Sequence, residues 1–470
     1  MAVPVSRRRL QFLRVSGSNN MDDDRSLPTV EARAGTESHS ESVAVENAKD
    51  GAESLDLNEL ETLSPGKLQE LYARFNLRMH LGRSRHQQVL DLVRHALSAE
   101  IPVAVNGFLE QVRDFYGTLR SPQLNFLPLP EDVGVSAGLI RHFKLRPGQM
   151  IAGRVRLPRD RETYLMLDRI TSIEGQSAEQ WEAPTAFDNL TPVYPEGRIM
   201  LENGVTKSIS ARAIDLLTPL GKGQRGLIVA APRVGKTILL KEIAKAIRVN
   251  HPDIVLIILL VDERPEEVTD LQRDVDCQIY NSTFDENSHR HVQVAELVLE
   301  RAKRLVEQHK DVVILLDSIT RLARGYNSLQ PGKGRIMSGG VEAKALLKPK
   351  KFFGAARNVE EGGSLTILAT TLVDTGSRMD QVIFEEFKGT GNMELHLDRS
   401  LVEKRLYPAI HVAQSGTRRE ELLYHPEEWA RVQVLRKTMA ALPPIEAMEL
   451  LIKNLEATKT NAELLLSGLR

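Results

Sequence analysis

The stretch Gly226-Leu-Ile-Val-Ala-Ala-Pro-Arg-Val-Gly-Lys-Thr237 determines how the rest of this chain is interpreted. The apolar run Leu227 to Ala231 predicts a buried strand, which Pro232 ends. The segment from Ile238 to Ile247 has its apolar residues at helical spacing. The sequence therefore predicts a strand, a short turn and a helix at this point of the chain.

A Gly-Lys-Thr sequence at such a junction is typical of the second half of a phosphate-binding P-loop. The helix N-terminus offers free N–H groups to a phosphate, Lys236 adds a positive charge, and the Thr237 hydroxyl can reach Mg²⁺. Ala230 stands where the motif usually has its first glycine. The motif indicates a nucleotide site, and the rest of the chain has to support it.

The bulk properties indicate an ordinary globular protein of 470 residues, which we expect to form about two to four domains. The longest apolar run, Ile254 to Val261, is too short to span a membrane, so no membrane association is expected. A single cysteine, Cys277, excludes an internal disulfide framework and favours a cytoplasmic location. Residues 1–20 lack the apolar core of an export signal, and Met21 allows them to be an extended or misassigned start.

The predicted organisation follows the changes in composition along the chain. An acidic, serine-rich beginning cannot offset the entropy of ordering. Apolar residues at helical spacing follow, then short β-like runs broken by glycine and proline, and finally strands alternating with helices. We predict disorder over 1–54, a helical module over 55–100, a small β-barrel over 103–173, a linker over 174–204 and an α/β domain with a mostly parallel sheet over 205–470.

The first two folded parts leave alternatives open. The helical module is either a packed cap or an accessory nucleic-acid contact. In the barrel, the run from Phe115 to Arg120 places two adjacent aromatic rings beside an arginine. Such rings are stacking platforms in oligonucleotide-binding barrels, where an arginine holds phosphate. The alternative is that at least one ring belongs to the core.

Two carboxylates follow buried strands of the α/β block. Asp317 ends the run Val312 to Asp317, which is how a Walker-B aspartate reaches Mg²⁺. Glu263 follows the run from Ile254 and is the candidate for orienting the water that attacks the γ-phosphate. The alternative for Glu263 is that it caps the next helix, and capping is the preferred role of the preceding Asp262. Arg264 either senses phosphate or fixes the loop.

Glycine-rich basic segments flank these motifs. Gly221-Lys-Gly-Gln-Arg-Gly226 precedes the P-loop strand, and its glycines let the backbone approach a ligand. Three further segments lie at 330–340, 375–378 and 388–391. Such loops suggest a second anion besides ATP, such as a nucleic-acid strand. A tight surface turn is the alternative for Gly221–Gly226, and composition alone assigns none of the other three segments to a nucleic acid.

At this point the chain resembles the transcription termination factor Rho family of bacterial RNA-dependent ATPases and helicases, from about residue 55 to the C-terminus. The resemblance rests on long, specific stretches. They are Gly223-Gln-Arg-Gly-Leu-Ile-Val-Ala230, Asp262-Glu-Arg-Pro-Glu-Glu-Val-Thr269, Leu315-Leu-Asp-Ser-Ile-Thr-Arg-Leu-Ala-Arg324, Lys351-Phe-Phe-Gly-Ala-Ala-Arg-Asn-Val-Glu-Glu-Gly-Gly-Ser364 and Glu385-Glu-Phe-Lys-Gly-Thr-Gly-Asn-Met-Glu-Leu395. The family also has alanine at the position of Ala230.

The resemblance implies a fold and an activity. It implies an OB-fold, cold-shock-like barrel that binds pyrimidine-rich single strands, and a RecA-like ATPase domain. The active form would be a homohexameric ring that moves 5′ to 3′ along nascent RNA and releases it from RNA polymerase. ATP and Mg²⁺ would be the cofactors, and RNA polymerase and elongation factors would be partners.

The resemblance also assigns roles to residues. Lys236, Glu263 and Arg418 would be catalytic, with Arg418 as an arginine finger toward the neighbouring subunit, and Thr237 and Asp317 would hold the metal. The predicted ATP-binding residues are Gly221, Lys222, Gly223, Gln224, Arg225, Gly226, Arg233, Val234, Gly235, Lys236, Thr237, Ile238, Arg264 and Tyr407. The predicted RNA-binding residues are Phe115, Tyr116, Gly117, Thr118, Leu119, Arg120, Glu162, Tyr164, Lys333, Arg335, Ile336, Ser338, Gly339, Gly340, Arg378 and Lys388.

The departures from the family pattern lie mainly in the barrel. The family motif Gly-Phe-Gly-Phe-Leu-Arg is Phe115-Tyr-Gly-Thr-Leu-Arg120 here, so Thr118 replaces one ring. A stacking tyrosine of the family falls on Gly134. In the P-loop, Arg233 replaces the usual lysine and keeps the charge with a different shape.

Two other functional classes compete with an RNA-dependent motor. A rotary-ATPase-type subunit also carries Gly-Lys-Gly-Gln-Arg-Gly before its P-loop, but the segments at 55–173 disfavour it. An RNA-binding homologue with an inactive motor is disfavoured by the presence of Lys236, Glu263, Asp317 and Arg418.

The loss of two aromatic platforms predicts weak or differently selective RNA loading. Each stacked base contributes roughly 1–3 kcal/mol, so two lost platforms should weaken primary-site binding about a hundredfold. Filter binding to poly(C) at fixed salt measures this effect. An affinity equal to that of a typical family member would contradict the prediction.

Overall fold

A computed structural model describes residues 54–80, 82–113, 116–160, 162–332 and 336–469. The predicted disorder at the start of the chain concerns residues outside these ranges, apart from Ser54. The same holds for Phe115, Lys333 and Arg335, three of the predicted RNA contacts.

The first described elements form a helical module. It contains strand β1 (Leu55–Asp56) and helices α1 (Leu57–Thr62), α2 (Pro65–Arg74) and α3 (Arg85–Ser98). Ser64 caps the start of α2 by accepting a hydrogen bond from Lys67 N, and Pro65 occupies the first turn. Ser84 and Gln87 form a reciprocal capping box at the start of α3.

A closed β-barrel follows the helical module. Its strands are β2 (Val103–Arg113), β3 (Tyr116–Arg120), β4 (Val133–Val135), β5 (Met150–Arg156) and β6 (Leu165–Ile173), with α4 (Ala137–His142) after β4 and the short β7 (Gln176–Ser177) beside β6. The sheet order is β2-β3-β4-β6-β5, and β2 also pairs with β5, which closes the barrel. The predicted barrel is thereby confirmed.

The helical module and the barrel share one hydrophobic core. Leu57 and Leu68 belong to the same buried cluster as Val105 and Ile151. The Asn58 side chain adds two hydrogen bonds to the backbone of Asn106, donating to its carbonyl at 2.9 Å and accepting from its N–H at 2.8 Å. The module is therefore anchored on the first barrel strand.

A buried acidic cluster lies at this junction. Glu61 of α1 has 6 % of its surface exposed, and Glu131, which precedes β4, is fully buried and contacts His86 at 2.6 Å. Burial raises the pKa of Glu61 to about 7, the carboxylates of Glu131, Asp132 and Asp56 raise it further, and the Ser121 hydroxyl opposes them. Glu61 therefore holds its proton near neutral pH.

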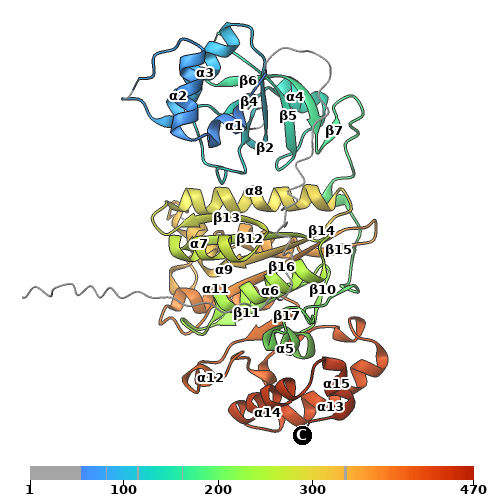
Figure 1. The fold of residues 1–470 in the computed structure, drawn as a ribbon. Helices are drawn as coiled ribbons and strands as arrows, with labels where there is room; N and C mark the ends of the chain where they lie inside the picture. The colour runs from blue at the N-terminus through green and yellow to red at the C-terminus, as the bar shows by residue number, and fades with distance from the viewer. Residues whose placement is uncertain (1–53, 81, 114–115, 161, 333–335, 470) are drawn as a thin grey trace, which may run out of the picture. The chain divides into compact units, whose positions relative to one another are not determined.

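The C-terminal block is a mostly parallel sheet covered on both faces, as predicted (Figure 1). The strand order is β13-β12-β14-β16-β11-β17-β18, and β15 and β8 (Pro192–Val193) extend it from β16. The strands are β11 (Arg225–Ala230), β12 (Val255–Glu263), β13 (Gln278–Thr283), β14 (Asp311–Asp317), β15 (Arg357–Val359), β16 (Ser364–Leu372), β17 (Met393–His396) and β18 (Gly416–Thr417).

Alternation along β12 shows how the two faces are filled. Leu256, Ile258 and Leu260 pack into one hydrophobic cluster, whereas Ile257 and Leu259 pack into the other. The first cluster is covered by α5 (Ile209–Leu217), α6 (Lys236–Asn250), α7 (Pro265–Asp274) and the C-terminal helices α13 (Pro426–Ala440), α14 (Pro444–Ala457) and α15 (Asn461–Ser467). The second is covered by α8 (Ser288–Val306), α9 (Ile319–Ser328), α10 (Leu347–Gly354) and α11 (Arg378–Lys388).

The segment predicted as a linker, 174–204, does more than connect. Its short strand β8 pairs with β15, and β9 (Arg198–Ile199) pairs with β10 (Leu220–Gly221). Phe187 and Leu190 enter the same buried cluster as α8. These strand pairings and the two buried side chains attach the segment to the C-terminal block. The composition of the segment did not indicate this attachment.

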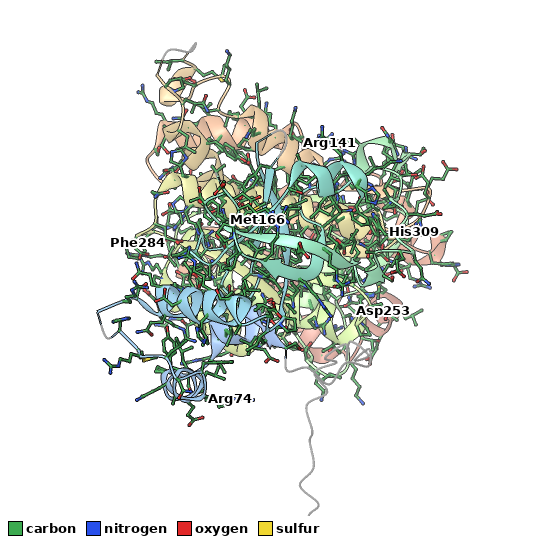
Figure 2. The ribbon with its side chains drawn as sticks, turned by 90° about the horizontal axis from the view of Figure 1, so that it is seen from above. Arg74, Arg141, Met166, Asp253, Phe284 and His309 are labelled. Carbon is green, nitrogen blue, oxygen red and sulfur yellow. The ribbon has the colours of Figure 1, made fainter. Side chains whose placement is uncertain are left out.

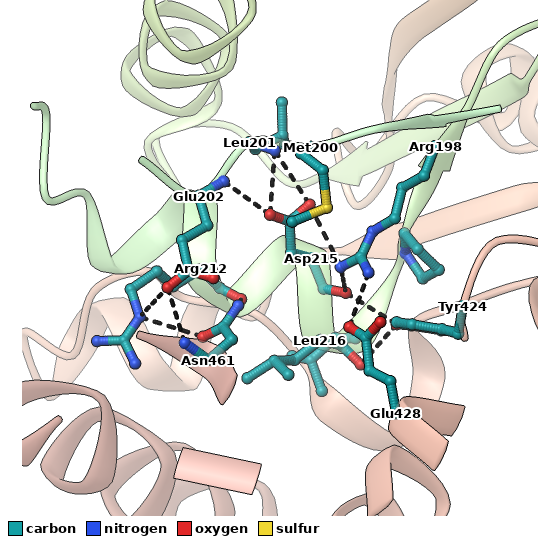
Figure 3. Close-up of polar contacts among 12 residues, drawn as sticks. Arg198, Met200, Leu201, Glu202, Arg212, Asp215, Leu216, Tyr424, Glu428 and Asn461 are labelled. Carbon is teal, nitrogen blue, oxygen red and sulfur yellow. Dashed lines mark hydrogen bonds and ion pairs between the residues drawn. The ribbon is translucent and has the colours of Figure 1, made fainter. Parts of the chain in front are cut away.

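Asp215 of α5 organises the packing of the C-terminal helices (Figure 3). Its fully buried carboxylate accepts hydrogen bonds from the backbone N–H groups of Leu201 and Glu202, and Arg198 lies 3.8 Å away. The Tyr424 hydroxyl donates to the Asp215 carbonyl at 2.8 Å. Burial raises the pKa of Asp215 to about 6, against the opposing effect of Arg198. This network joins three segments that are distant in sequence.

No helix within the described ranges is long and apolar enough to cross a membrane.

Glu61→Gln should stabilise the protein at alkaline pH. The folded-state pKa of Glu61 lies above the ordinary value, so its contribution to stability is present at low pH and lost as pH rises through about 7. A neutral amide avoids this loss, which is about 3 kcal/mol at pH 8 and about 1 kcal/mol at pH 5. Thermal unfolding at the two pH values measures it.

The exposed Glu59 on the same helix provides the matched control, Glu59→Gln. An equal effect of Glu61→Gln at both pH values would contradict the assigned protonation.

Candidate nucleotide and RNA sites

The P-loop forms the predicted junction between β11 and α6. Gly235 has a φ of 90° at the N-cap of α6, and no side chain caps that end of the helix. The first N–H groups of α6 are therefore free to bind a phosphate. Arg233, also at positive φ, is exposed beside the turn.

Two predicted catalytic residues, Lys236 and Glu263, and the predicted metal ligand Asp317 meet at the carboxyl edge of the sheet. The Lys236 ammonium donates to Glu263 Oε1 at 2.9 Å and to Asp317 Oδ2 at 2.6 Å. The other oxygen of Asp317 accepts a hydrogen bond from Thr370 at 2.7 Å. Burial lowers the pKa of Lys236, but the two carboxylates outweigh it and the net shift is upward. Lys236 is therefore firmly cationic.

Glu263 has the environment of a tuned base. Only 1 % of its surface is exposed. Burial and the nearby Asp317 raise its pKa, while Lys236 and Arg321 oppose the rise. Capping does not explain this residue, because α7 begins after Arg264 without a side-chain cap.

Sequence reasoning assigned no role to Arg321, although it lies in the stretch that carries the family resemblance. Its guanidinium lies 3.4 Å from Glu263 Oε1 and 3.9 Å from Asp262 Oδ2. Arg321 lies in the first turn of α9, four residues after Asp317. This spacing from the metal-site aspartate is the sequence signal that could have identified Arg321. Arg321 is a positioning residue for the Glu263 carboxylate.

The remaining groups around the P-loop fit a magnesium nucleotide. The Thr237 hydroxyl donates to Glu267 Oε2 at 3.1 Å and lies beside Lys236, while Asp317 presents a buried carboxylate. A hydroxyl and a carboxylate are oxygen ligands of the kind Mg²⁺ prefers. Mg²⁺ bound there would neutralise phosphate charge.

A small apolar pocket adjoins the P-loop. It has a volume of about 160 Å³, and Gly235, Ile238 and Tyr407 are among its lining residues. Ile238 and Tyr407 are 65 % and 53 % exposed, so an apolar flat ligand could cover them. The pocket brings together the predicted residues Val234, Ile238 and Tyr407.

Residues 221–226, which are predicted to bind ATP, do not lie beside the P-loop of the same chain. Gly221, Lys222, Gly223, Gln224, Arg225 and Gly226 lie before or in the first half of β11, and the P-loop follows the other end of that strand. Each has a structural partner: the Lys222 ammonium binds Asp311 at 2.6 Å, and the Arg225 guanidinium donates to two backbone carbonyls. Glycine is required at 223 because a Cβ there would lie 2.1 Å from Asn358 N.

Arg418 lies at the same amino end of β11. Its N–H donates to the carbonyl of Asn392, whose side chain in turn accepts from Arg225 N. The six residues of β11 separate this point from the P-loop by roughly 17 Å. That span exceeds the reach of an arginine side chain, so Arg418 cannot serve the nucleotide of its own chain.

Two of the predicted RNA loops lie side by side. A Cβ at Gly339 would lie 2.8 Å from the backbone of Arg378, so the turn Ser338–Gly340 packs on the start of α11. Ile336 is 64 % exposed and Arg378 is exposed. The structure therefore groups Ile336, Ser338, Gly339, Gly340 and Arg378.

Lys388 does not belong to that group. It ends α11, ten residues after Arg378 and roughly 15 Å along the helix. His396 and then Lys388 and Arg418 lower the pKa of Glu394, which places Lys388 toward Arg418. Lys388, a predicted RNA contact, therefore lies apart from the group of Ile336, Ser338–Gly340 and Arg378.

Four predicted RNA contacts of the barrel are not free. Leu119 is a core residue, and Thr118 has 4 % of its surface exposed. The Arg120 guanidinium forms ion pairs with Glu110 and Asp132, so it is committed within the protein rather than free to hold phosphate. Gly117 is also buried, against Leu109.

The exposed predicted contacts of the barrel are Tyr116, Tyr164 and Glu162. Tyr116 is partly exposed and Tyr164 is 41 % exposed. Arg156 binds the Glu162 carboxylate at 2.7 and 2.9 Å and holds its pKa down at about 2. These side chains form the accessible part of the predicted RNA surface.

Comparison with known families finds a match for the barrel and a match for the C-terminal block. Residues 105–179 match the Rho termination factor, RNA-binding domain, and residues 210–417 match the ATP synthase alpha/beta family, nucleotide-binding domain. The transcription termination factor Rho of Akkermansia muciniphila is 52 % identical over 425 residues, which cover 90 % of each chain.

The chain belongs to the transcription termination factor Rho family. The Rho protein of Pseudomonas aeruginosa is 52 % identical, and the match covers 87 % of this chain and 98 % of that relative. The Rho protein of Allochromatium vinosum is 54 % identical, and the match covers 82 % of this chain and 92 % of that relative. The family resemblance stated from sequence motifs is thereby confirmed.

A solved structure of a prototypical ATPase from the type III secretion system of pathogenic bacteria has a similar fold. It aligns with a TM-score of 0.50 at 22 % identity and covers 64 % of this Rho family chain and 86 % of that chain. This likeness supports the RecA-like fold of the ATPase domain.

Arg321→Gln should move the acid limb of the pH profile for ATP hydrolysis to higher pH. Arg321 opposes the burial that raises the pKa of Glu263, so removing its charge raises that pKa further. A base with a higher pKa stays protonated to higher pH, and we expect a shift of about one pH unit. Steady-state rates across pH measure it.

The control is Arg324→Gln on the same helix. Arg324 pairs with Asp380 at 2.6 Å and not with Glu263. An unmoved acid limb in Arg321→Gln would remove Arg321 from this role.

Proposed function

We propose that this chain is an RNA-stimulated ATPase that moves 5′ to 3′ along nascent RNA and ends transcription by releasing that RNA from RNA polymerase. The observation that carries the proposal is the buried cluster of Lys236, Glu263 and Asp317 in a chain whose barrel matches the Rho RNA-binding domain.

The cluster supports ATP hydrolysis by its chemistry. Lys236 and the free N–H groups of α6 would bind the phosphates, and Glu263 would orient and deprotonate the attacking water. When ATP draws Lys236 away, Arg321 still neutralises part of the Glu263 charge. Mg²⁺ bound near Thr237 and Asp317 would supply charge stabilisation for the phosphoryl group.

The position of Arg418 supports a ring of identical subunits. The exposed Arg418 lies at the end of β11 opposite the P-loop of its own chain. An arginine finger acts in trans when a neighbour presents it to the nucleotide. Head-to-tail contact between copies, closed as a hexamer, would bring Arg418 to the next subunit's P-loop.

The paired loops at Ser338–Gly340 and Arg378 support a second RNA contact, because they are exposed, glycine-rich and basic. In a ring they would face the central channel, while the barrel would load the RNA. Since nascent RNA is made in the cytoplasm of a bacterium, we place the protein there, with RNA polymerase and elongation factors as its partners.

The rotary-type alternative has less support. The match to the ATP synthase alpha/beta nucleotide-binding domain covers residues 210–417, whereas residues 105–179 match an RNA-binding domain. An inactive motor also has little support, because the catalytic cluster is intact.

ATP hydrolysis with and without single-stranded RNA tests the proposal. We expect turnover to rise at least tenfold with RNA, and the Glu263→Gln protein to bind ATP with turnover reduced at least a hundredfold, since general-base catalysis contributes roughly 10²–10⁴-fold. RNA-independent turnover would favour the rotary alternative, and no turnover at all would favour an inactive motor.

A further inference from the structure

One face of the barrel carries Thr118, Gly134 and Met166 in a row across three strands. Thr118 of β3 pairs with Gly134 of β4, and Gly134 pairs with Met166 of β6. Tyr116 stands two residues before Thr118, and successive side chains of a strand alternate between faces, so both lie on this face. Figure 2 labels Met166 on its barrel strand.

The Tyr116 ring occupies the space above Gly134. A Cβ added at Gly134 would lie 2.3 Å from the Tyr116 hydroxyl oxygen, 3.0 Å from its Cζ and 2.6 Å from the sulfur of Met166. The tyrosine therefore extends diagonally from β3 across β4. Its hydroxyl lies 3.9 Å from Met166 Sδ, and Met166 is 2 % exposed. No side chain fits at position 134 while Tyr116 keeps this place.

Polar and aromatic side chains surround the Tyr116 ring. Burial raises the pKa of the Tyr116 phenol, and the neighbouring Tyr164, Glu162 and Asp132 add to the rise. Tyr164 is 41 % exposed, and Tyr116 keeps part of its own surface open to solvent. The two tyrosines are thus neighbours on one accessible face, and the phenol stays protonated.

We propose that Gly134 sets the position of the base-stacking platform of the barrel, because its missing side chain lets the Tyr116 ring lie across β4 onto Met166, where a base of single-stranded RNA stacks on it. This inference rests on the proposed RNA-binding function. Gly134 therefore does more than lack the aromatic ring of its relatives, because it leaves the space in which the Tyr116 ring lies. A stacked base contributes about 1–3 kcal/mol, so the platform determines much of the loading affinity.

The consequence is a coupling between positions 116 and 134. Gly134→Ala puts a methyl group where the Tyr116 hydroxyl and Met166 sulfur lie, so the ring must turn away. Tyr116→Ala removes the ring itself. If the glycine acts only through the ring, the second substitution adds nothing to the first.

Fluorescence anisotropy with a fluorescein-labelled oligocytidylate at fixed salt tests this coupling. We expect Gly134→Ala and Tyr116→Ala each to weaken binding about tenfold, and the double variant to bind within about twofold of Tyr116→Ala. The control is Gly138→Ala in α4, where an added Cβ meets only Ser136 Oγ at 3.8 Å, and we expect it to bind like the wild type.

A second readout reports the ring directly. In protein labelled with [methyl-¹³C]methionine, the Met166 signal, assigned with Met166→Leu, should shift in Gly134→Ala without RNA, because the ring current of Tyr116 moves. It should also shift when RNA binds the wild type. Unchanged Met166 signals in both cases would overturn the inference, even if Gly134→Ala proves too unstable for binding measurements.

The binding outcomes separate this inference from the proposed function. Wild-type binding that Gly134→Ala leaves unchanged overturns the inference alone, as does a double variant weakened about a hundredfold. A wild type that binds no RNA overturns the proposed function and the inference together.

Discussion

The structure depends on the contact of one buried ammonium with two buried carboxylates. Lys236 begins α6, Glu263 ends β12 and Asp317 ends β14. Two anions so close together in a dry site would repel each other, and the lysine offsets that repulsion. The same lysine is needed for phosphate, so a nucleotide competes with the carboxylates for it. Arg321 and Thr370 keep each carboxylate partly satisfied during that competition.

The parallel sheet brings these groups together and also separates others. Neighbouring parallel strands place their carboxyl ends at one edge, which assembles Lys236, Glu263 and Asp317. The other edge receives Arg225, Lys388 and Arg418. One chain therefore places its P-loop at one end of β11 and the proposed finger arginine at the other. In the proposed ring, copies of the chain would meet to complete each site.

The barrel combines fixed and adaptable parts. Arg120 is bound between Glu110 and Asp132, and Asp132 adjoins the acidic cluster of Glu61 and Glu131 at the helical module. These buried charges fix the part of the barrel that lies beneath the exposed tyrosines. Above them, Tyr116 and Tyr164 remain accessible, and the glycine at 134 sets where the Tyr116 ring can lie. The barrel differs from the pattern expected for its family mostly in this adaptable layer.

The sequence by itself determined the main strands around the P-loop and the residues proposed for catalysis. Apolar periodicity located the strands predicted at Leu227–Ala231, Ile254–Val261 and Val312–Asp317 to within two residues, because buried strands and amphipathic helices have distinct spacings. The motifs identified Lys236, Glu263 and Asp317 because their chemistry is local to strand ends. The tertiary structure decided what depends on contacts between distant segments. The fold placed Gly221–Gly226 at the end of β11 away from the P-loop and paired Arg120 with carboxylates. It also brought Arg321 close to Glu263 and placed the Tyr116 ring over Gly134. No local sequence pattern records these contacts, because each joins residues that are far apart in the chain.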